Sequence, residues 1–539
     1  MTFTFTTLLI FILFVQIIHF LGTWKLYIKA GRKAWEAAVP IYNAIVLMKI
    51  INRSPWWTLL LFIPIVNLIM FPVIWVETLR SFGRNSNTDT FLGVCTFGLY
   101  IYYINYTQDV TYISDRSLKP RTAAGEWISS ILFAVVAATI VHTYVMQPFT
   151  IPTSSLEKTL LVGDFLFVSK FHYGARMPMT AISFPMVHDS IPVIGTKSYL
   201  DQPQLPYFRL PGFQKIKRND IVVFSWPTDT LIDINRPGKG FKVKPLDKKS
   251  NYVKRCVGVP GDELQIKDGY VYINGEQNVL PDRAKLQFRY KIISRNSFVK
   301  TDNKGRYTNQ PSAFVSSHFN ISDIYISDID RENKIITHIA QMTDEAYEKV
   351  KNNPNVIEVE KLTEEEGVWN QSVFPQDPRF NWNTKYFGPI TIPQAGTTIN
   401  ISVENISLYK RIIEVYEGSE VGINNKISLS GTQVMLNNEQ ITEYTFLQDY
   451  YWMMGDNRDN SQDARMWGLV PFNHVVGKPV FIWMSWDTNA KGIMNKIRWD
   501  RMFTTVSGEG KPISYFKYFI ILLAGWYIFN FIRKRKKKA

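Results

Sequence analysis

The sequence predicts a membrane-anchored, mainly β protein: a β-barrel or sandwich domain with an inserted lobe, together with α-helical transmembrane segments. Two observations predict this class. Long uninterrupted apolar runs stand near both ends of the 539-residue chain, and short runs of alternating apolar and polar residues stand between them. An apolar run of about 18 residues or more can cross a bilayer as a helix, whereas alternation with a period of two is typical of a strand that buries one face.

The first apolar run, FTTLLIFILFVQIIHFLG, lacks the basic start and the small-residue cleavage site of a secretory signal, so it is interpreted as an anchor. WISSILFAVVAATIVHTYVM, residues 127–146, is a second clear span. Residues 56–76 and the shorter run 91–106 predict further spans, and residues 513–532 predict the last one. A multi-span region, residues 1–126, therefore precedes the anchor at 127–146.

Basic residues beside the spans predict which side of the membrane each part faces. The tail, residues 533–539, is almost wholly basic, and Arg116, Lys119 and Arg121 precede the anchor. Because Lys and Arg favour the cytoplasmic side of a membrane, both segments are expected there. The region from about 147 to 512 then lies outside the cytoplasm.

This external region is predicted to form strands joined by tight turns. KRNDIVVFSWP is an apolar strand that follows a turn. ELQIKDGYVYINGEQ places two alternating runs around Lys267-Asp268-Gly269, which is a hairpin signal, and VMLNNEQIT repeats the pattern.

Composition becomes polar and charged between residues 285 and 384, where EKLTEEEG is typical of a solvated surface. We interpret residues 285–384 as a segment inserted into the β domain. The insertion divides that domain into a first part at 147–284 and a second part at 385–512.

The sequence lacks the features that usually indicate several other function classes. The net charge of +15 does not predict nucleic-acid binding, because the basic tail abuts an apolar run as a membrane flank does. No HExxH or CxxC pattern offers metal ligands, and Cys95 and Cys256 lie far apart in apolar or strand-like stretches. No GxSxG nucleophile elbow and no GxxxxGK[ST] loop occur. No metal or organic cofactor is implied.

The first stretch that suggests catalytic residues is IPTSSLEKTL, residues 151–160. Ser155 and Lys158 spell S-x-x-K, the opening motif of penicillin-binding enzymes, but the S-D-N and K-T-G elements are missing. Lys158 is more simply interpreted as a solvent-facing lysine after a turn. A serine without a histidine can be activated by a lysine that burial keeps neutral. Lys254, in the apolar-flanked strand YVKRCVGVPGDEL, is the stronger candidate for that role.

A third stretch, MGDNRDNSQDARMWGLVP, packs many polar groups into a short loop between apolar residues. Such a loop is either a surface turn or a buried hydrogen-bond network, and the pattern alone leaves both open.

Together these pieces resemble type I signal peptidases, membrane enzymes that remove signal peptides from exported proteins. Five stretches are similar to the motifs of that family and follow in the same order: MQPFTIPTSSLEKTL, VGDFLFVSKFHYG, KRNDIVVF, YVKRCVGVPGD and GDNRDNSQDARMWG. RWDR near the end is a further similarity. The resemblance covers about 127–265 and 385–502, and the additional spans and the long insertion look like Bacteroidetes-type members.

The resemblance implies a role for each matching residue. Ser155 is expected to be the nucleophile and Lys254 the general base. Thr153 and the Ser155 backbone N–H are expected to form the oxyanion hole. The residues expected to orient the lysine or support the site are Ser461, Asp463, Arg465 and Asp456. The residues expected to line small apolar pockets, for small side chains such as alanine at the −1 and −3 substrate positions, are Ile151, Pro152, Leu156, Leu160, Tyr252 and Val253.

The sequence departs from the family pattern where Ser154 and Asn219 replace glycines, Leu156 a methionine, Lys158 a proline and Ala464 a serine. None of these removes a group that the mechanism needs. The implied partners are preproteins, the lipid bilayer of the cell (inner) membrane and, by proximity, the secretion translocon. A catalytically inactive membrane scaffold of the same fold and an S-x-x-K acyl enzyme remain the alternatives.

Overall fold

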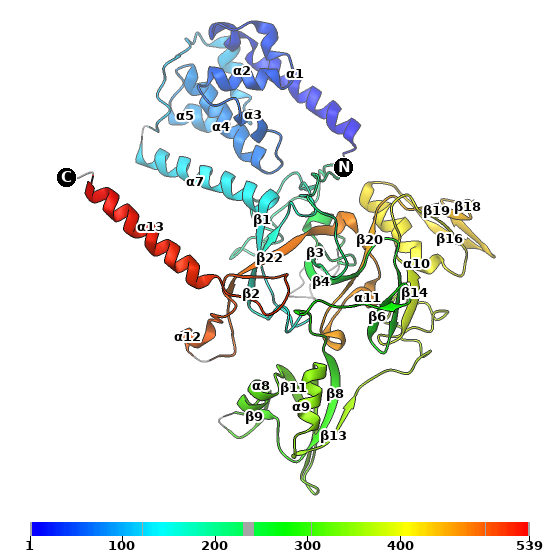
Figure 1. Cartoon of the computed structure of the whole chain (residues 1–539). Coiled ribbons are helices and arrows are strands. Elements are labelled where there is room, and N and C mark those ends of the chain that lie inside the picture. The colour runs from blue at the N-terminus through cyan, green and yellow to red at the C-terminus, as the bar shows by residue number, and fades with distance from the viewer. Residues whose placement is uncertain (1–2, 121, 230–241, 303, 491, 537–539) are drawn as a thin grey trace. The chain divides into compact units, whose positions relative to one another are not determined.

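The computed structural model describes residues 3–120, 122–229, 242–302, 304–490 and 492–536 (Figure 1). Arg121, Lys537 and Lys538, which the orientation argument used, lie outside the described residues. The chain divides into two compact units. The first comprises Met1–Met146, Ala175–Pro211 and Asp229–Lys249, and the second Gln147–Gly174, Gly212–Thr228 and Ser250–Ala539.

The first unit begins with a bundle of helices. They are α1 (Phe5–Lys29), η1 (Ala34–Ala37), α2 (Tyr42–Ile50), α3 (Trp57–Leu60), α4 (Val66–Ser81), α5 (Asn87–Cys95), α6 (Tyr100–Thr107) and α7 (Ala123–Ile140). Helices α1 and α6 pack closely, because Gly22 leaves room for the Tyr102 ring and Asn105 accepts a hydrogen bond from the Leu26 N–H. Residues from α1, α2, α4 and α6 share one apolar core.

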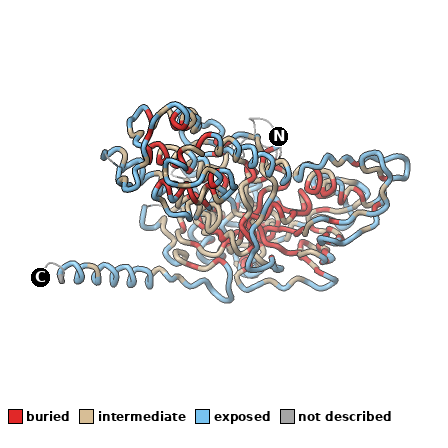
Figure 2. The backbone as a smooth tube through the Cα atoms, turned by 90° about the horizontal axis from the view of Figure 1, so that it is seen from above, coloured by how far each residue is buried: buried red, intermediate tan, exposed pale blue. Residues whose placement is uncertain are grey.

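Among the described residues, three helices are long and apolar enough to cross a membrane: Phe5–Lys29, Ala123–Val145 and Phe516–Arg535. These correspond to three of the spans that the sequence predicts: the first apolar run, residues 127–146 and residues 513–532. The last of them, α13 (Phe516–Lys536), is exposed along nearly its whole length (Figure 2). A helix that is apolar all round and exposed is expected to be covered by lipid.

The other two predicted spans are wrong as single helices. Residues 56–76 are interrupted between α3 and α4, because Pro64 disfavours a helical conformation before it and Ile65 takes φ 71°. Residues 91–106 are interrupted between α5 and α6, where Phe97 and Gly98 both have positive φ. The apolar composition of each run suggested one long helix, but a local turn divides each run into two shorter helices.

The second unit is built on a curled antiparallel sheet, so the predicted mainly β class is confirmed. Its strand order is β1-β2-β22-β3-β4-β20-β21, with β23 paired to β22. The strands are β1 (Met146–Thr150), β2 (Asp164–Ser169), β3 (Ile221–Ser225), β4 (Asn251–Gly258), β20 (Tyr450–Met454), β21 (Val470–Pro471), β22 (Val475–Ser485) and β23 (Thr504–Thr505).

Strand β3 explains why this sheet is apolar on both faces. Ile221 and Val223 enter one core cluster, while Val222 and Phe224 enter another. Since successive side chains of a strand point to opposite faces, a continuous apolar run marks a strand covered on both sides. Strand β4, which lies beside β3, is therefore held between two packed layers.

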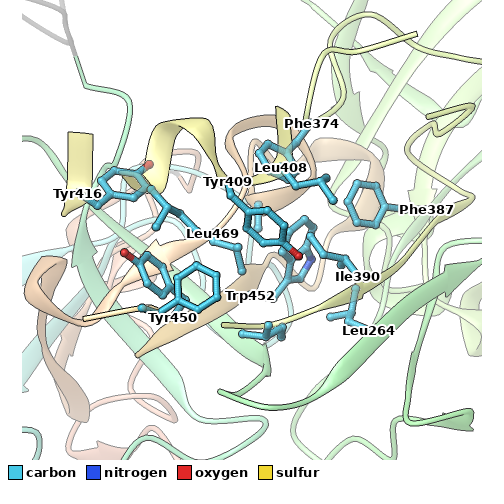
Figure 3. Close-up of a cluster of buried hydrophobic side chains, with 14 of the residues drawn as sticks. Leu264, Phe374, Phe387, Ile390, Leu408, Tyr409, Tyr416, Tyr450, Trp452 and Leu469 are labelled. Atoms are coloured by element: carbon cyan, nitrogen blue, oxygen red, sulfur yellow. The ribbon is translucent and has the colours of Figure 1, made fainter. Parts of the chain in front are cut away.

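The predicted hairpins form. Strands β5 (Glu263–Lys267) and β6 (Tyr270–Ile273) are joined by Asp268 and Gly269, both with positive φ as a tight two-residue turn requires. β17 (Gln433–Leu436) and β18 (Glu439–Ile441) are joined in the same way. β5, β6 and β14 (Phe387–Thr391) pack on a large core around Trp452, Phe387 and Tyr450 (Figure 3).

Much of the inserted segment has a core of its own. Strands β8 (Phe288–Ser294), β11 (Asp323–Asp330), β12 (Ile335–Met342) and β13 (Val356–Lys361) form a sheet in the order β11-β12-β8-β13. Helices α8 (Ala313–His318) and α9 (Asp344–Lys351) add Val315, Ala346 and Val350 to its apolar cluster.

Candidate active site

The structure brings Ser155 and Lys254 together. Ser155 lies in the loop between β1 and β2, and Lys254 lies in the middle of β4. The Lys254 Nζ and the Ser155 Oγ are hydrogen-bonded at 2.6 Å, and the two residues are only 6% and 3% exposed. A serine hydroxyl in contact with a buried amine is a geometry in which the amine can take the hydroxyl proton.

Burial changes the acidity of this lysine. Removal from water disfavours the ammonium form and lowers the pKa of Lys254 from 10.5 to about 8. The carboxylates of Asp463 and Asp456 act in the opposite direction, and the Arg465 cation adds to the lowering. A useful fraction of the neutral amine therefore exists near neutral pH.

The loop that carries Ser155 runs from residue 151 to 163, between β1 and β2, and is here called the serine loop. It is held by the polar loop after β20. The Asn457 N–H donates to the Ser155 carbonyl at 3.0 Å, and the Asn457 side chain donates to the Ser154 carbonyl at 3.2 Å. Asn460 donates to the Ser154 hydroxyl at 3.0 Å. The stretch MGDNRDNSQDARMWGLVP is thus largely a buried network rather than a surface turn.

Gly455 permits this close approach. A Cβ at Gly455 would lie 2.3 Å from the Ser461 Oγ and 2.6 Å from the Ser155 carbonyl oxygen. Any side chain at this position would displace the serine loop. The sequence motif contains this glycine but does not indicate its role, because only the folded loop shows which atoms the glycine faces.

Asp456 pairs with Arg255, the residue that follows Lys254 in β4. Arg255 Nε and Nη2 donate to the two carboxylate oxygens of Asp456 at 2.8 and 2.7 Å, and both side chains are buried. Thr159 also donates to Asp456, at 2.7 Å. The predicted supporting role of Asp456 thus has a partner, Arg255, that sequence reasoning did not assign. A second basic residue in a buried strand was the available signal.

Asp463 and Arg465 form a second buried ion pair. Arg465 Nε and Nη2 donate to Asp463 at 2.9 and 2.8 Å, and Asp463 also accepts from the Gly455 N–H at 3.1 Å. Arg465 reaches the Arg458 carbonyl at 2.6 Å. The pair therefore closes the polar loop on itself, at the point where it meets the serine loop.

The remaining predicted residues differ in how they are placed. Within the described chain, the buried Ser461 Oγ has no hydrogen-bond partner, so it makes no hydrogen bond with Lys254 in this geometry. Thr153 and Pro152 are exposed on the serine loop. Among the residues expected to line substrate pockets, Tyr252 and Val253 are partly exposed, while three are buried in one apolar cluster: Ile151, Leu156 and Leu160.

Lys158 is not brought to Ser155. Its Nζ donates to the Asn320 Oδ1 at 3.1 Å and to the Ser322 Oγ at 3.2 Å, both in the inserted segment. The expectation of a solvent-facing lysine is met only in part, because the residue is half-buried and its amine contacts the inserted segment. This geometry argues against an S-x-x-K acyl enzyme, because the Lys158 amine that would serve as its base is hydrogen-bonded to the inserted segment and not to Ser155.

The RWDR stretch supports the end of the serine loop. Arg501 donates to Asp164 at 2.5 and 3.1 Å and to the Thr159 carbonyl at 3.1 Å. Arg498 donates to the Val162 carbonyl at 2.9 Å. Asp164 begins β2 and is fully buried, so the loop is fixed at its far end by charge-assisted hydrogen bonds.

The structure gives little support for a cysteine nucleophile or a metal site. Cys256 is fully buried, and burial raises the pKa of its thiol, which leaves it protonated and unreactive. Within the described ranges, no group of three or more His, Cys, Asp or Glu side chains could hold a metal ion.

A mainly β domain with apolar anchoring helices and a buried serine–lysine contact is the arrangement of a membrane-associated serine peptidase. The family model described as signal peptidase, peptidase S26, matches residues 124–317 and 392–486, which make up more than half of the chain. The chain therefore belongs to the signal peptidase family, peptidase S26. A second model, of a family of unknown function (DUF5684), matches residues 35–115 of the helical bundle.

Three curated relatives, each named signal peptidase I, are similar to this chain over about 70% of its length. The relative from Buchnera aphidicola subsp. Acyrthosiphon pisum is 25% identical over 381 residues, which cover 70% of this chain and 80% of that protein. The Haemophilus influenzae relative is 25% identical, with 72% and 78% covered. The Helicobacter pylori relative is 23% identical, with 72% and 93% covered. The predicted resemblance to type I signal peptidases is confirmed.

Proposed function

We propose that this protein removes signal peptides from exported preproteins with Ser155 as nucleophile and Lys254 as general base. The observation that carries the proposal is the 2.6 Å contact between the Ser155 Oγ and the buried Lys254 Nζ. An inactive scaffold would not need this contact, because burying a lysine amine costs stability that an apolar side chain at the same position would not cost. Family membership supplies the reaction class, and the geometry supplies the two groups.

In the proposed reaction, the neutral Lys254 amine accepts the Ser155 proton as the Oγ attacks the scissile carbonyl. The resulting ammonium gives that proton to the leaving amine of the mature chain, and the signal peptide stays attached to Ser155 as an ester. Lys254 then takes a proton from water, the hydroxide attacks the ester, and the proton returns to Ser155 as the signal peptide leaves.

Charge that develops on the carbonyl oxygen needs hydrogen-bond donors. We assign this role to the Thr153 hydroxyl and the Ser155 N–H, because Thr153 lies two residues before the nucleophile on its exposed loop. Loss of one such donor costs about 3 kcal/mol of barrier. Ser461 is proposed to orient the lysine because the family resemblance implies that role; in this geometry its buried hydroxyl makes no hydrogen bond among the described residues.

Small residues such as alanine are the proposed substrate side chains at the −1 and −3 positions. Ile151, Leu156 and Leu160 close the core beneath the loop. Pro152 is exposed and Tyr252 and Val253 are partly exposed, so we propose that these three residues meet the short substrate side chains.

The membrane helices give the proposed location. We place the protein in the cell (inner) membrane with the β domain on the extracytoplasmic side and the basic C-terminal tail in the cytoplasm, as the positive-inside rule implies. Preproteins emerge on that side, close to the secretion translocon, and an anchored enzyme meets them there.

Two lysines provide a matched test of the general base. A purified preprotein with an Ala-x-Ala site is incubated with the full-length enzyme in detergent, as wild type, Lys254→Met and Lys158→Met. The proposal expects Lys254→Met to abolish cleavage and Lys158→Met to leave it readily measurable. The reverse result would instead support the S-x-x-K enzyme, and a wild type without cleavage would support the scaffold.

A further inference from the structure

Lys158 has an unusual backbone. Its φ is 71°, in the left-handed region that costs a non-glycine residue free energy. A proline, which the family pattern has at this position, cannot adopt that angle, since its ring fixes φ near −65°. The chain therefore shapes this loop in its own way, and an observed strain of this kind calls for contacts that hold it.

Those contacts come from the inserted lobe. The Lys158 Nζ donates to Asn320 and Ser322, which both lie just before β11. On the other side of the nucleophile, Asn460 donates to the Ser154 hydroxyl and, at 3.2 Å, to Asp323. Residues 320–323, here called the latch segment, thus contact the serine loop directly at Lys158 and, through Asn460, indirectly at Ser154.

The latch segment is itself fixed within the lobe. Ile321 and Ile324 are 1% and 0% exposed and belong to the apolar core of the lobe. Asn320 and Ser322, the two neighbours of Ile321, are exposed, so they do not enter that core. A core that anchors Ile321 and Ile324 can hold the residues beside them in place against another loop.

A second attachment joins the lobe to the polar loop of the site. Gln287, directly before β8, donates its N–H to the Asp456 carbonyl at 3.0 Å and accepts from the Arg458 N–H at 2.9 Å. The Arg289 N–H donates to the Asp459 carboxylate at 2.8 Å. The lobe therefore contacts both loops that meet at Ser155.

We propose that the inserted lobe is a positioning element for the nucleophile, in which the latch segment holds the serine loop through Lys158. Lys158 is a positioning residue that acts through the loop and touches no reacting atom. The proposal rests on the proposed function, because it requires Ser155 to be the nucleophile. Reacting groups that are misplaced by about 1 Å can lose a factor of about 100 in rate.

The test is a double-mutant cycle on the full-length enzyme, with steady-state cleavage of a preprotein and thermal unfolding measured for each variant. Lys158→Met removes the donor and keeps the length of the side chain. Asn320→Ala with Ser322→Ala removes the acceptors. Lys349→Met is the matched control, because Lys349 is an exposed lysine of the lobe that pairs with Glu345 on the surface of α9.

We expect Lys158→Met and the acceptor variant each to lower kcat about tenfold with little change in KM or in the unfolding temperature. The combined variant should be no worse than either, because one interaction is lost only once. Lys349→Met should match the wild type.

The latch proposal is overturned if Lys158→Met keeps the wild-type kcat, if the two losses multiply in the combined variant, or if only KM changes. Lys254→Met, run in parallel, separates this failure from failure of the proposed function. Cleavage that survives Lys254→Met overturns the proposed function and the latch with it. Cleavage that Lys254→Met abolishes and Lys158→Met leaves intact overturns the latch alone.

Discussion

Lys254 shows how one side chain acquires its chemistry from its surroundings. An amine in water is almost fully protonated at neutral pH, but between two packed layers the charged form loses its hydration. The buried carboxylates nearby limit this effect and keep the pKa at about 8 rather than lower. The residue is thus divided between its two protonation states near pH 8, which suits the general-base role proposed for it.

This acidity predicts a pH dependence. Because only the neutral amine can accept the Ser155 proton, kcat/KM should rise about tenfold per pH unit below 8 and level off above it. The measurement is initial cleavage rates at subsaturating preprotein from pH 6 to 11. A rise centred near 10.5, the ordinary value for lysine, would show that burial does not tune this group.

A glycine next to the site gives a second prediction at this scale. Gly455→Ala should lower kcat about 100-fold, because its Cβ would push against the Ser155 carbonyl and the Ser461 hydroxyl. Gly525→Ala in α13 is the control, since its Cβ meets no atom of the chain. Equal activity of the two variants would contradict the close packing of the two loops.

Elements bring these residues together over long sequence distances. Strand β4 presents Lys254 and Arg255 on opposite faces, and both faces are buried. The loop after β20 then supplies Asp456, whose pair with Arg255 fixes that loop against β4. The serine loop is held at one end by this loop and at the other by Arg501.

Sequence patterns predicted the strands and hairpins well, because alternation and paired turn residues are local signals. The motifs also identified Ser155 and Lys254 as candidates, which the fold places in contact. Pairings such as Arg255 with Asp456 or Lys158 with Asn320 could not be foreseen, since each joins segments whose approach depends on the whole fold. The break at Ile65 was missed because apolar content hides a turn.

Arg501 carries the prediction that belongs to the element scale. Arg501→Met leaves Asp164 buried with an unpaired charge, which should cost about 3 kcal/mol and lower the unfolding temperature in detergent by several degrees. Arg306→Met is the control, because its pair with Asp302 is exposed. Similar unfolding temperatures for both variants would mean that the RWDR stretch does not hold the serine loop.

At the scale of the whole molecule, three candidate membrane helices among the described residues lie before or after, in sequence, the β domain that carries the proposed serine and lysine. The chain covers 80% of the Buchnera aphidicola relative named above, yet residues 35–115 match a separate family model. The two family models thus match different parts of the chain, the helical bundle and the β domain.

The proposed orientation can be tested with two cysteines in a Cys95→Ser background, since Cys256 is buried. In right-side-out vesicles, a membrane-impermeant maleimide should label Leu447→Cys, an exposed site in the β domain, without permeabilisation. Lys534→Cys in the tail should be labelled only after the vesicles are opened. The opposite pattern would reverse the topology.

The central claim is that Ser155, and not its neighbour Ser154, attacks the signal peptide. Ser155→Ala and Ser154→Ala differ by one position in the same loop, so they share any general effect on folding. With the reconstituted full-length enzyme and a preprotein, the mature N-terminus is measured by mass spectrometry over time. The account predicts the wild-type cleavage site and substantial activity for Ser154→Ala, and no product for Ser155→Ala. Undiminished mature product from Ser155→Ala would contradict it.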